Sequence, residues 1–249
     1  MKKTLLCALG LLAVASAFAQ TTVYDSTVGI TGVAFAIGGA TVVGSNTITS
    51  LAADDVTMTN LGSGMDIVAM QFAVANFDSV DVTFRPKVRM WLNDGALGAP
   101  GTYYNNPTAV DYTFSPITVA AGFINVLGAS IPAGLMTIPS GTIWVGIQFD
   151  NNNGTTGATA ANLNNLGVVI NSPTVGSSAD EIFASDTPAS DLFNVANPSG
   201  LIGDFGGVPK ADLVWRFDAQ APVPEPASMV VLGAGLAFVA SRRRRRKAA

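Results

Sequence analysis

The feature that most constrains the fold is an alternation of apolar and polar residues along residues 80–92, in which Trp91 is the one apolar residue in the polar register. A period of two is typical of a β-strand with one face in a core and the other in water. Pro86 lies in the apolar register and cannot donate to a ladder, which predicts an edge strand or a bulge. Val80, Val82, Phe84, Val88, Met90 and Leu92 fall on the apolar side, and Asp81, Thr83, Arg85, Lys87 and Arg89 on the other.

Similar short patterns recur between Gln20 and Ala221, and no sustained helical period interrupts them. Strand-like runs separated by Gly, Pro, Asn and Asp are typical of two packed antiparallel sheets, because each sheet then needs only one apolar face. We therefore expect an all-β, two-sheet antiparallel, jelly-roll-like sandwich that forms one domain over residues 20–221. Further strands are expected at residues 67–74, 112–119, 123–127, 143–150, 167–170 and 213–217.

Composition excludes several kinds of chemistry. The chain has no His, so catalytic triads, zinc sites and proton relays built on imidazole are excluded. Its one Cys lies in the first apolar segment. Residues 20–221 contain five cations and sixteen acids, a net charge of −11, which argues against nucleic acid as a partner. We expect a domain that is not an enzyme and that holds no metal ion or cofactor.

The acidic residues offer only weak candidates for a site. Asp54-Asp55 and Asp180-Glu181 are adjacent pairs, and neighbours on a strand point to opposite faces, so neither pair forms a catalytic dyad alone. A hydrolase that uses distant Asp carboxylates is the lesser alternative. The sequence Asp150-Asn151-Asn152-Asn153-Gly154 resembles a calcium loop only in part, because Gly stands at the fifth position and no Glu follows at the twelfth. A hairpin turn is the better interpretation.

A cationic strand face beside aromatic residues is a candidate glycan-binding surface. Three of the five cations of residues 20–221 point the same way along one strand, and three aromatic side chains near its end could stack on sugar rings. The same cations could instead pair with Asp on neighbouring strands, and the aromatic residues could fill the core. The sequence leaves both interpretations open. The residues concerned are Arg85, Lys87, Arg89, Trp91, Tyr103 and Tyr104.

Residues 1–19 have the three parts of an export signal. Met1-Lys2-Lys3 is positively charged, a short apolar stretch follows, and Ala17 and Ala19 occupy the small-residue positions that place a cut before Gln20. We expect the export machinery and signal peptidase to be the first partners of the chain.

Residues 222–249 combine three features in a fixed order: a proline-rich motif (222–226), an apolar run (227–240) and a basic tail (241–249). Fourteen apolar residues form a helix of about 21 Å, which is short against a hydrocarbon core of about 30 Å and could span it with snorkelling cations. The cations resist translocation, which predicts a cytoplasmic tail and an external domain. The basic residues are Arg242, Arg243, Arg244, Arg245, Arg246 and Lys247.

This C-terminal segment resembles the PEP-CTERM sorting domain. The resemblance rests on the motif Val223-Pro224-Glu225-Pro226-Ala227, the short glycine-containing apolar run and the terminal arginine cluster. Proteins with this domain are understood as substrates of exosortase, a membrane-embedded cysteine protease/transpeptidase of bacteria that make exopolysaccharide. The resemblance implies that Pro224, Glu225 and Pro226 form the element that this enzyme recognises. A plain tail anchor has the same topology but leaves the proline motif unexplained.

A second resemblance concerns the central domain. Residues 89–102, followed by residues 141–147, are similar to secreted bacterial β-sandwich modules that occur with varied surface anchors and mostly lack an assigned activity. The combined expectation is an exported protein, transiently anchored in the inner membrane by its C-terminal helix and then delivered to the cell surface or secreted. Its expected role is structural or exopolysaccharide-associated, in the extracellular matrix; a glycan-binding module is the alternative.

Overall fold

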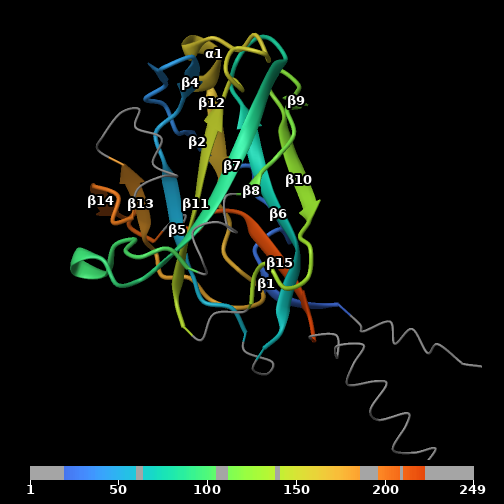
Figure 1. The fold of residues 1–249 in the computed structure, drawn as a ribbon, viewed down its shortest axis with the longest axis vertical. Coiled ribbons are helices and arrows are strands. Elements are labelled where there is room, and N and C mark those ends of the chain that lie inside the picture. The colour runs from blue at the N-terminus through green and yellow to red at the C-terminus, as the bar shows by residue number, and fades with distance from the viewer. Residues whose placement is uncertain are drawn as a thin grey trace, which may run out of the picture.

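Two antiparallel β-sheets pack face to face in the computed structural model, which describes residues 20–59, 64–104, 112–137, 141–185, 196–207 and 210–221 (Figure 1). The expected all-β, two-sheet antiparallel sandwich is confirmed. No helix in these ranges is both long and apolar enough to cross a membrane. The predicted signal segment (1–19) and sorting segment (222–249), with their expected helices, lie outside the described residues.

The first sheet is centred on β6 and has the strand order β1-β15-β6-β12-β2, with β10 on the opposite edge of β6. The second sheet has the order β14-β13-β5-β11-β4-β3, and β7 pairs with β11 on one side and with β8 and β9 on the other. The elements are β1 (Thr21–Asp25), β2 (Ala34–Ala36), β3 (Thr41–Val43), β4 (Asn46–Ile48), β5 (Ala52–Val56), β6 (Asp66–Asn76), β7 (Val82–Leu92), η1 (Ala96–Gly98), β8 (Tyr112–Thr113), β9 (Ile117–Val119), β10 (Ile124–Ser130), β11 (Ile143–Asp150), α1 (Ala160–Asn164), β12 (Leu166–Val169), β13 (Ile182–Ser185), β14 (Gly200–Gly203) and β15 (Trp215–Gln220).

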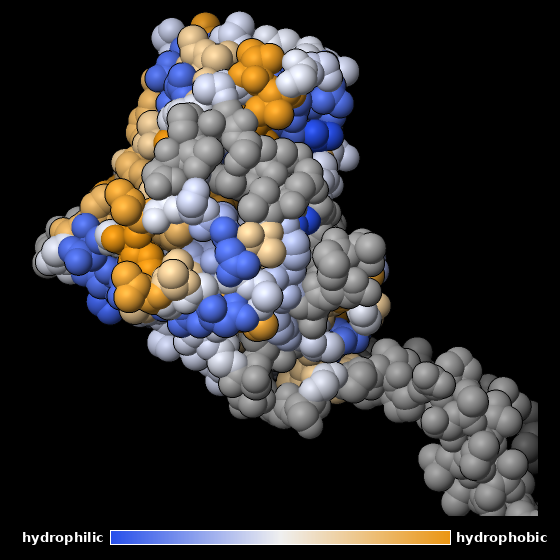
Figure 2. Space-filling model, turned by 60° about the vertical axis from the view of Figure 1, so that its left-hand side comes forward, coloured by the Kyte–Doolittle hydropathy of each residue, from blue (hydrophilic) through white to orange (hydrophobic). Residues whose placement is uncertain are grey.

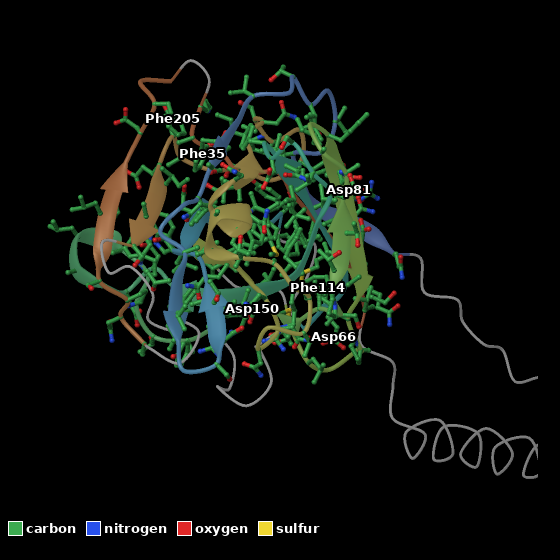
Figure 3. The ribbon with its side chains drawn as sticks, turned by 90° about the horizontal axis from the view of Figure 1, so that it is seen from above. Phe35, Asp66, Asp81, Phe114, Asp150 and Phe205 are labelled. Atoms are coloured by element: carbon green, nitrogen blue, oxygen red, sulfur yellow. The ribbon has the colours of Figure 1, made fainter. Side chains whose placement is uncertain are left out.

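The main core lies between the two sheets, and side chains fill this space when the molecule is seen from above (Figure 3). The rings of Phe84 and Phe149 meet edge to face with their centroids 4.9 Å apart. The predicted apolar face of β7 is confirmed within the strand. Val80 is an exception: it precedes β7 and is 51% exposed. Core residues from both sheets include Met70, Phe72, Val82, Phe84, Val88, Met90, Val145, Ile147, Phe149, Trp215 and Phe217.

Pro86 lies in a strand with partners on both sides, so the prediction of an edge strand was wrong. It faces Phe149 of β11, and its carbonyl accepts a hydrogen bond from the Phe114 amide at 3.1 Å on the other side. Because the N–H and C=O of a strand residue point the same way, the missing donor faces the gap between Thr113, where β8 ends, and Ile117, where β9 begins. The interrupted partner therefore accommodates the proline.

The other face of the second sheet, expected to be in water, is also covered. A second core is formed there by Leu51, Ala53, Trp91, Trp144 and Phe183. The segment 93–103 folds back over it, and the Trp144 indole N–H donates to the Gly98 carbonyl at 2.8 Å. A Cβ at Gly146 would lie 2.7 Å from the Trp91 ring, so only glycine fits at that position. Alternation identified the strand correctly, but it could not show that a loop would cover the polar side.

Candidate functional site

The residues predicted to direct sorting and processing lie outside the described residues, with one exception. Gln20, the predicted first residue after cleavage, is exposed and directly precedes β1. At the other end β15 finishes at Gln220, so only Ala221 separates this strand from the proline motif. The residues outside the described ranges are Ala17, Ala19, Pro224, Glu225, Pro226, Arg242, Arg243, Arg244, Arg245, Arg246 and Lys247.

Arg85 is held by a buried carboxylate. Its Nε donates to Oδ1 of Asp150 at 2.8 Å and its Nη2 to Oδ2 at 2.5 Å, while Nη1 donates to Asn152 Oδ1 at 2.7 Å. Asp150, which is fully buried, also accepts from the Asn46 side-chain amide and from the Asn152 backbone N–H. The carboxylate of Asp150 is thus neutralised by protein groups.

The segment after Asp150 is a turn, as predicted, but not a hairpin, because it leads into α1 and then β12, which belongs to the other sheet. Asn152, Asn153 and Gly154 have φ angles of 50°, 55° and 81°. The Asn151 side-chain oxygen accepts from the Gly154 N–H at 3.0 Å. These left-handed conformations suit Asn and Gly, which explains the composition of the turn.

The other residues of the predicted glycan-binding face do not form an open platform: Trp91 and Tyr103 belong to the second core, whereas Tyr104 packs against the main core. Lys87 and Arg89 are 7% and 3% exposed, and Trp91 is fully buried in the second core. The Arg89 guanidinium lies 4.2 Å from the centroid of the Tyr103 ring. The Tyr104 hydroxyl donates to the Thr137 carbonyl at 3.0 Å. The aromatic residues are thus packed in or against the two cores, which is the alternative given for them, and Arg85 pairs with an Asp of a neighbouring strand, which is the alternative given for the cations.

A cluster of buried carboxylates, the Asp212 cluster, lies where the two sheets meet and comprises Asp54, Asp55 and Asp212 with the Ser178 hydroxyl. Asp54 shares the core side of β5 with Ala52 and Val56 by alternation. Ser178 Oγ lies 3.1 Å from Asp54 Oδ1 and 3.2 Å from Asp55 Oδ1. The backbone N–H of Leu213, next to Asp212, donates to Asp54 Oδ2 at 2.9 Å. Segments distant in sequence therefore converge on these acids.

Two buried polar groups, one in the Asp212 cluster and one beside it, have no hydrogen-bond partner within the described residues. They are the Asp212 carboxylate, through both of its oxygens, and the hydroxyl of Tyr24. Both side chains are fully buried. Asp55, by contrast, turns toward the backbone N–H of Ala179, at 3.1 and 3.0 Å from its two oxygens. Across the ranges that the structure describes, no three Asp, Glu, Cys or His side chains come together as a ready metal centre.

Burial and like charge make the Asp212 cluster electrostatically unfavourable when it is ionised. Burial raises the pKa of Asp54 well above its usual range, and the charges of Asp55 and Asp212 raise it further. Burial raises the pKa of Asp212 to about 6; Ser178 and the exposed Lys210 oppose the increase. The pKa of the Tyr24 phenol is also raised, first by burial and then by the carboxylates of Asp54 and Asp212.

The backbone around residues 174–178 positions this cluster. Val175 bridges to Asp25, at the end of β1, and Ser177 bridges to Thr57, just after β5, so this segment joins the two sheets. Gly176 has a φ of +77°, and a Cβ there would lie 2.7 Å from the Tyr24 ring. The sequence reasoning noted Asp54-Asp55 but missed Ser178 and Asp212. The available signal for a buried acidic cluster was the presence of Asp residues inside the apolar stretches 51–58 and 211–217.

Exposed apolar residues on the face drawn in Figure 2 form separate patches with polar residues between them. One hollow with an apolar rim, of about 330 Å³, is lined by residues from β2, the end of β6 and the start of β10. Phe77 and Phe123, at this hollow, are 51% and 65% exposed, and Gly32 and Gly122 line it without side chains. We call it the Phe77–Phe123 hollow.

The comparisons with known proteins agree with the C-terminal resemblance. Residues 222–246 match the PEP-CTERM protein-sorting motif, so the chain carries this sorting signal at its C-terminal end. It is accordingly an exported, membrane-transiting protein sorted through this motif, which implies processing by an exosortase-type membrane enzyme. No curated protein sequence matches the chain significantly.

The similar solved structures share very little sequence with the chain. One contains the cysteine protease and lectin-like domains of Cwp84, a surface layer associated protein of Clostridium difficile; it is 10% identical, with a TM-score of 0.38 over 71% of this chain and 33% of that one. Another is a variant of the clostridial cysteine protease Cwp84 after propeptide cleavage; it is 13% identical, with a TM-score of 0.32 over 71% of this chain and 37% of that one. The chain thus spans about a third of the length of these proteins.

Proposed function

We propose that this protein is a non-catalytic component of the cell surface or extracellular matrix, in a structural or exopolysaccharide-associated role. Its signal segment directs export, and its C-terminal apolar helix holds it briefly in the inner membrane. An exosortase-type enzyme then recognises Pro224, Glu225 and Pro226 and processes the chain. The observation that carries the proposal is the match of residues 222–246 to the sorting motif.

The charge distribution supports this order of events. The six cations beside the apolar run favour a cytoplasmic tail, whereas residues 20–221 carry a net charge of −11. A domain with this charge is repelled by anionic headgroups and stays clear of the membrane surface once it is exported. β15 ends one residue before the motif, so the proline-rich segment 222–226 is a short spacer between a folded domain and the bilayer.

The test replaces the motif and follows processing in the native host. We expect Glu225→Ala, and separately deletion of residues 242–247, to leave the C-terminal segment attached and the protein in the membrane fraction. Mass spectrometry of both ends of the protein measures this result. Glu181→Ala is the matched control, because Glu181 is an exposed residue of the β-domain and its replacement leaves the motif intact. Wild-type processing of both motif variants would contradict the proposal.

Glycan binding is the second candidate, and the Phe77–Phe123 hollow is the observation that favours it. The exposed aromatic rings lie beside lining residues that are glycine and alanine, which allows a flat sugar ring to approach and stack on them. Of the cations predicted for this role, Lys87 and Arg89 are buried and Arg85 is engaged by Asp150, and the net charge of the domain disfavours an anionic polysaccharide. A neutral glycan is therefore the proposed ligand.

Isothermal titration with neutral oligosaccharides tests this candidate. We expect Phe123→Ala to weaken binding about tenfold, because one stacking contact is lost. Phe205→Ala is the matched control: Phe205 is also partly exposed, but its ring packs on Phe35 with the centroids 5.3 Å apart (Figure 3). Equal affinities of the wild type and Phe123→Ala would remove this site.

A further inference from the structure

We propose that the Asp212 cluster binds a calcium ion, held by the carboxylates of Asp54 and Asp212 and by the Ser178 hydroxyl. Buried polar groups in folded proteins almost always have partners, and a fully buried carboxylate with two bare oxygens points to a missing ligand. Asp212 is fully buried, and neither of its oxygens has a hydrogen-bond partner in the described residues. A cation is the ligand that removes both the desolvation cost and the repulsion between these acids.

The protein does not supply that compensation from the groups around the cluster. Asp54 receives neutral donors, the Ser178 hydroxyl and the Leu213 amide. Asp180 and Glu181 are further acids near the cluster, and their charges act on Asp212 and Asp55 respectively. Lys210 opposes this effect on Asp212, but it is exposed to solvent. The balance of charge at the cluster is therefore strongly negative.

The chemistry of the available ligands selects calcium. All of them are oxygen atoms, from carboxylates and hydroxyls, and they belong to separate segments of irregular spacing. Calcium accepts six to eight such oxygens in flexible geometry, whereas magnesium requires a near-ideal octahedron. Asp55 is engaged by the Ala179 amide, and no set of three acidic side chains in the described ranges forms a metal centre alone. Two carboxylates, the hydroxyl and water molecules would therefore complete the coordination.

The position of the cluster gives the ion a structural role. Residues 174–178 bridge β1 of the first sheet to Thr57, which follows β5 of the second. An ion on Asp54 and Asp212 would join β5 to the segment that leads into β15. Ser178 is partly exposed, so the segment 177–180 offers a path by which an ion enters. This inference is independent of the sorting motif and of the proposed function.

Thermal unfolding of the purified full chain tests the proposal. Protein treated with EDTA is compared with the same protein in calcium chloride. We expect Tm to rise with the calcium concentration, because an ion that binds only the folded state stabilises it by mass action. Asp212→Asn should abolish this rise, and Ser178→Ala should weaken calcium affinity measured by isothermal titration. Asp81→Asn is the matched control, because Asp81 is exposed and its bond to the Ala121 amide can be kept by the Asn oxygen.

Each outcome decides the proposal. One calcium ion per chain in the wild type and in Asp81→Asn, with none in a folded Asp212→Asn, supports it. If Asp212→Asn does not fold, weaker calcium binding by Ser178→Ala supports it and unchanged binding overturns it. A Tm that responds to neither EDTA nor calcium overturns it, and the carboxylates are then neutralised by protons. An equal shift with magnesium overturns the assignment to calcium. None of these results depends on processing at Glu225.

Discussion

Asp150 and Asp212 are both fully buried aspartates, but their surroundings differ in kind. Asp150 is gripped by the Arg85 guanidinium through two hydrogen bonds and accepts two more from Asn46 and Asn152. Asp212 accepts none in the described residues and lies near two other acids. One buried carboxylate thus has a cation built into the chain, whereas the other lacks one and, as we propose, takes its cation from solution.

Strand register explains why only one of the two acids has an internal cation. Asp150 at the end of β11 lies directly opposite Arg85 of β7, so the ladder itself brings opposite charges together. Asp212 precedes β15 and comes near β5 only through the packing of irregular segments. No ladder places a basic residue beside it. Its neighbour in sequence, Lys210, is exposed.

The largest expected effect comes from removing the internal cation. Arg85→Met leaves Asp150 buried without its charge partner, which typically costs about 3–5 kcal/mol of unfolding free energy. Urea denaturation of the purified protein measures the loss. Arg216→Met is the control: its side chain is 35% exposed against 20% for Arg85, and its pairs with Asp25 and Asp218, at 3.7 and 3.2 Å, are longer, so its loss should cost less.

A second variant distinguishes loss of the charge pair from loss of packing by the arginine stem. Asp150→Asn in the Arg85→Met background removes the stranded charge, so part of the lost stability should return. If Arg85→Met destabilises no more than Arg216→Met, or if Asp150→Asn makes the double variant worse, the contrast between the two aspartates is wrong.

The alternation of residue types predicted the central strands well and their neighbours poorly. β6, β7 and β11 coincide closely with predicted runs, because each is a long strand with a face in the main core; β7 and β11 alternate, and β6 is a nearly continuous apolar run. The short strands β1 to β5, β13 and β14 were not predicted. Their lengths of three to five residues leave too few positions to establish a period. The positions of these short strands are specified by their pairing with a longer neighbouring strand and not by a local sequence pattern.

The candidate sites show the same limit. The sorting signal is a linear motif within residues 222–249, so it could be recognised from the sequence alone. The sequence could not decide whether Arg85, Lys87 and Arg89 lie on an open face, because that decision required knowing what covers the face. Asp212 was missed because its significance depends on Asp54 and Ser178, which meet it only in the folded chain. Charge count alone cannot say which acids lack a partner.

Asp94 is a third, exposed kind of carboxylate and carries the smallest expected effect. The Thr102 hydroxyl, and then the Thr102 backbone N–H at 2.7 Å, lower its pKa by hydrogen bonding to the charged form. Stability from a lowered pKa is present above the ordinary value of about 3.9 and is lost as the pH falls through the folded-state value. Acid should therefore loosen the segment 93–103 that covers Trp144. Titration of the Asp94 carboxyl by NMR measures this effect.

Replacing the hydroxyl separates this local bond from the charge of the whole domain. Thr102→Val keeps the size of the side chain and the backbone N–H donor but removes the larger of the two causes. Its Asp94 should titrate at higher pH than in the wild type, while the domain stays folded, since Asp94 is exposed and can be solvated by water. If Asp94 titrates identically in both proteins, the negative field of the domain and not the Thr102 hydroxyl controls its protonation. The protonation of carboxyl groups in this fold would then depend on the overall charge more than on local partners. That result would contradict the contrast drawn between Asp150 and Asp212.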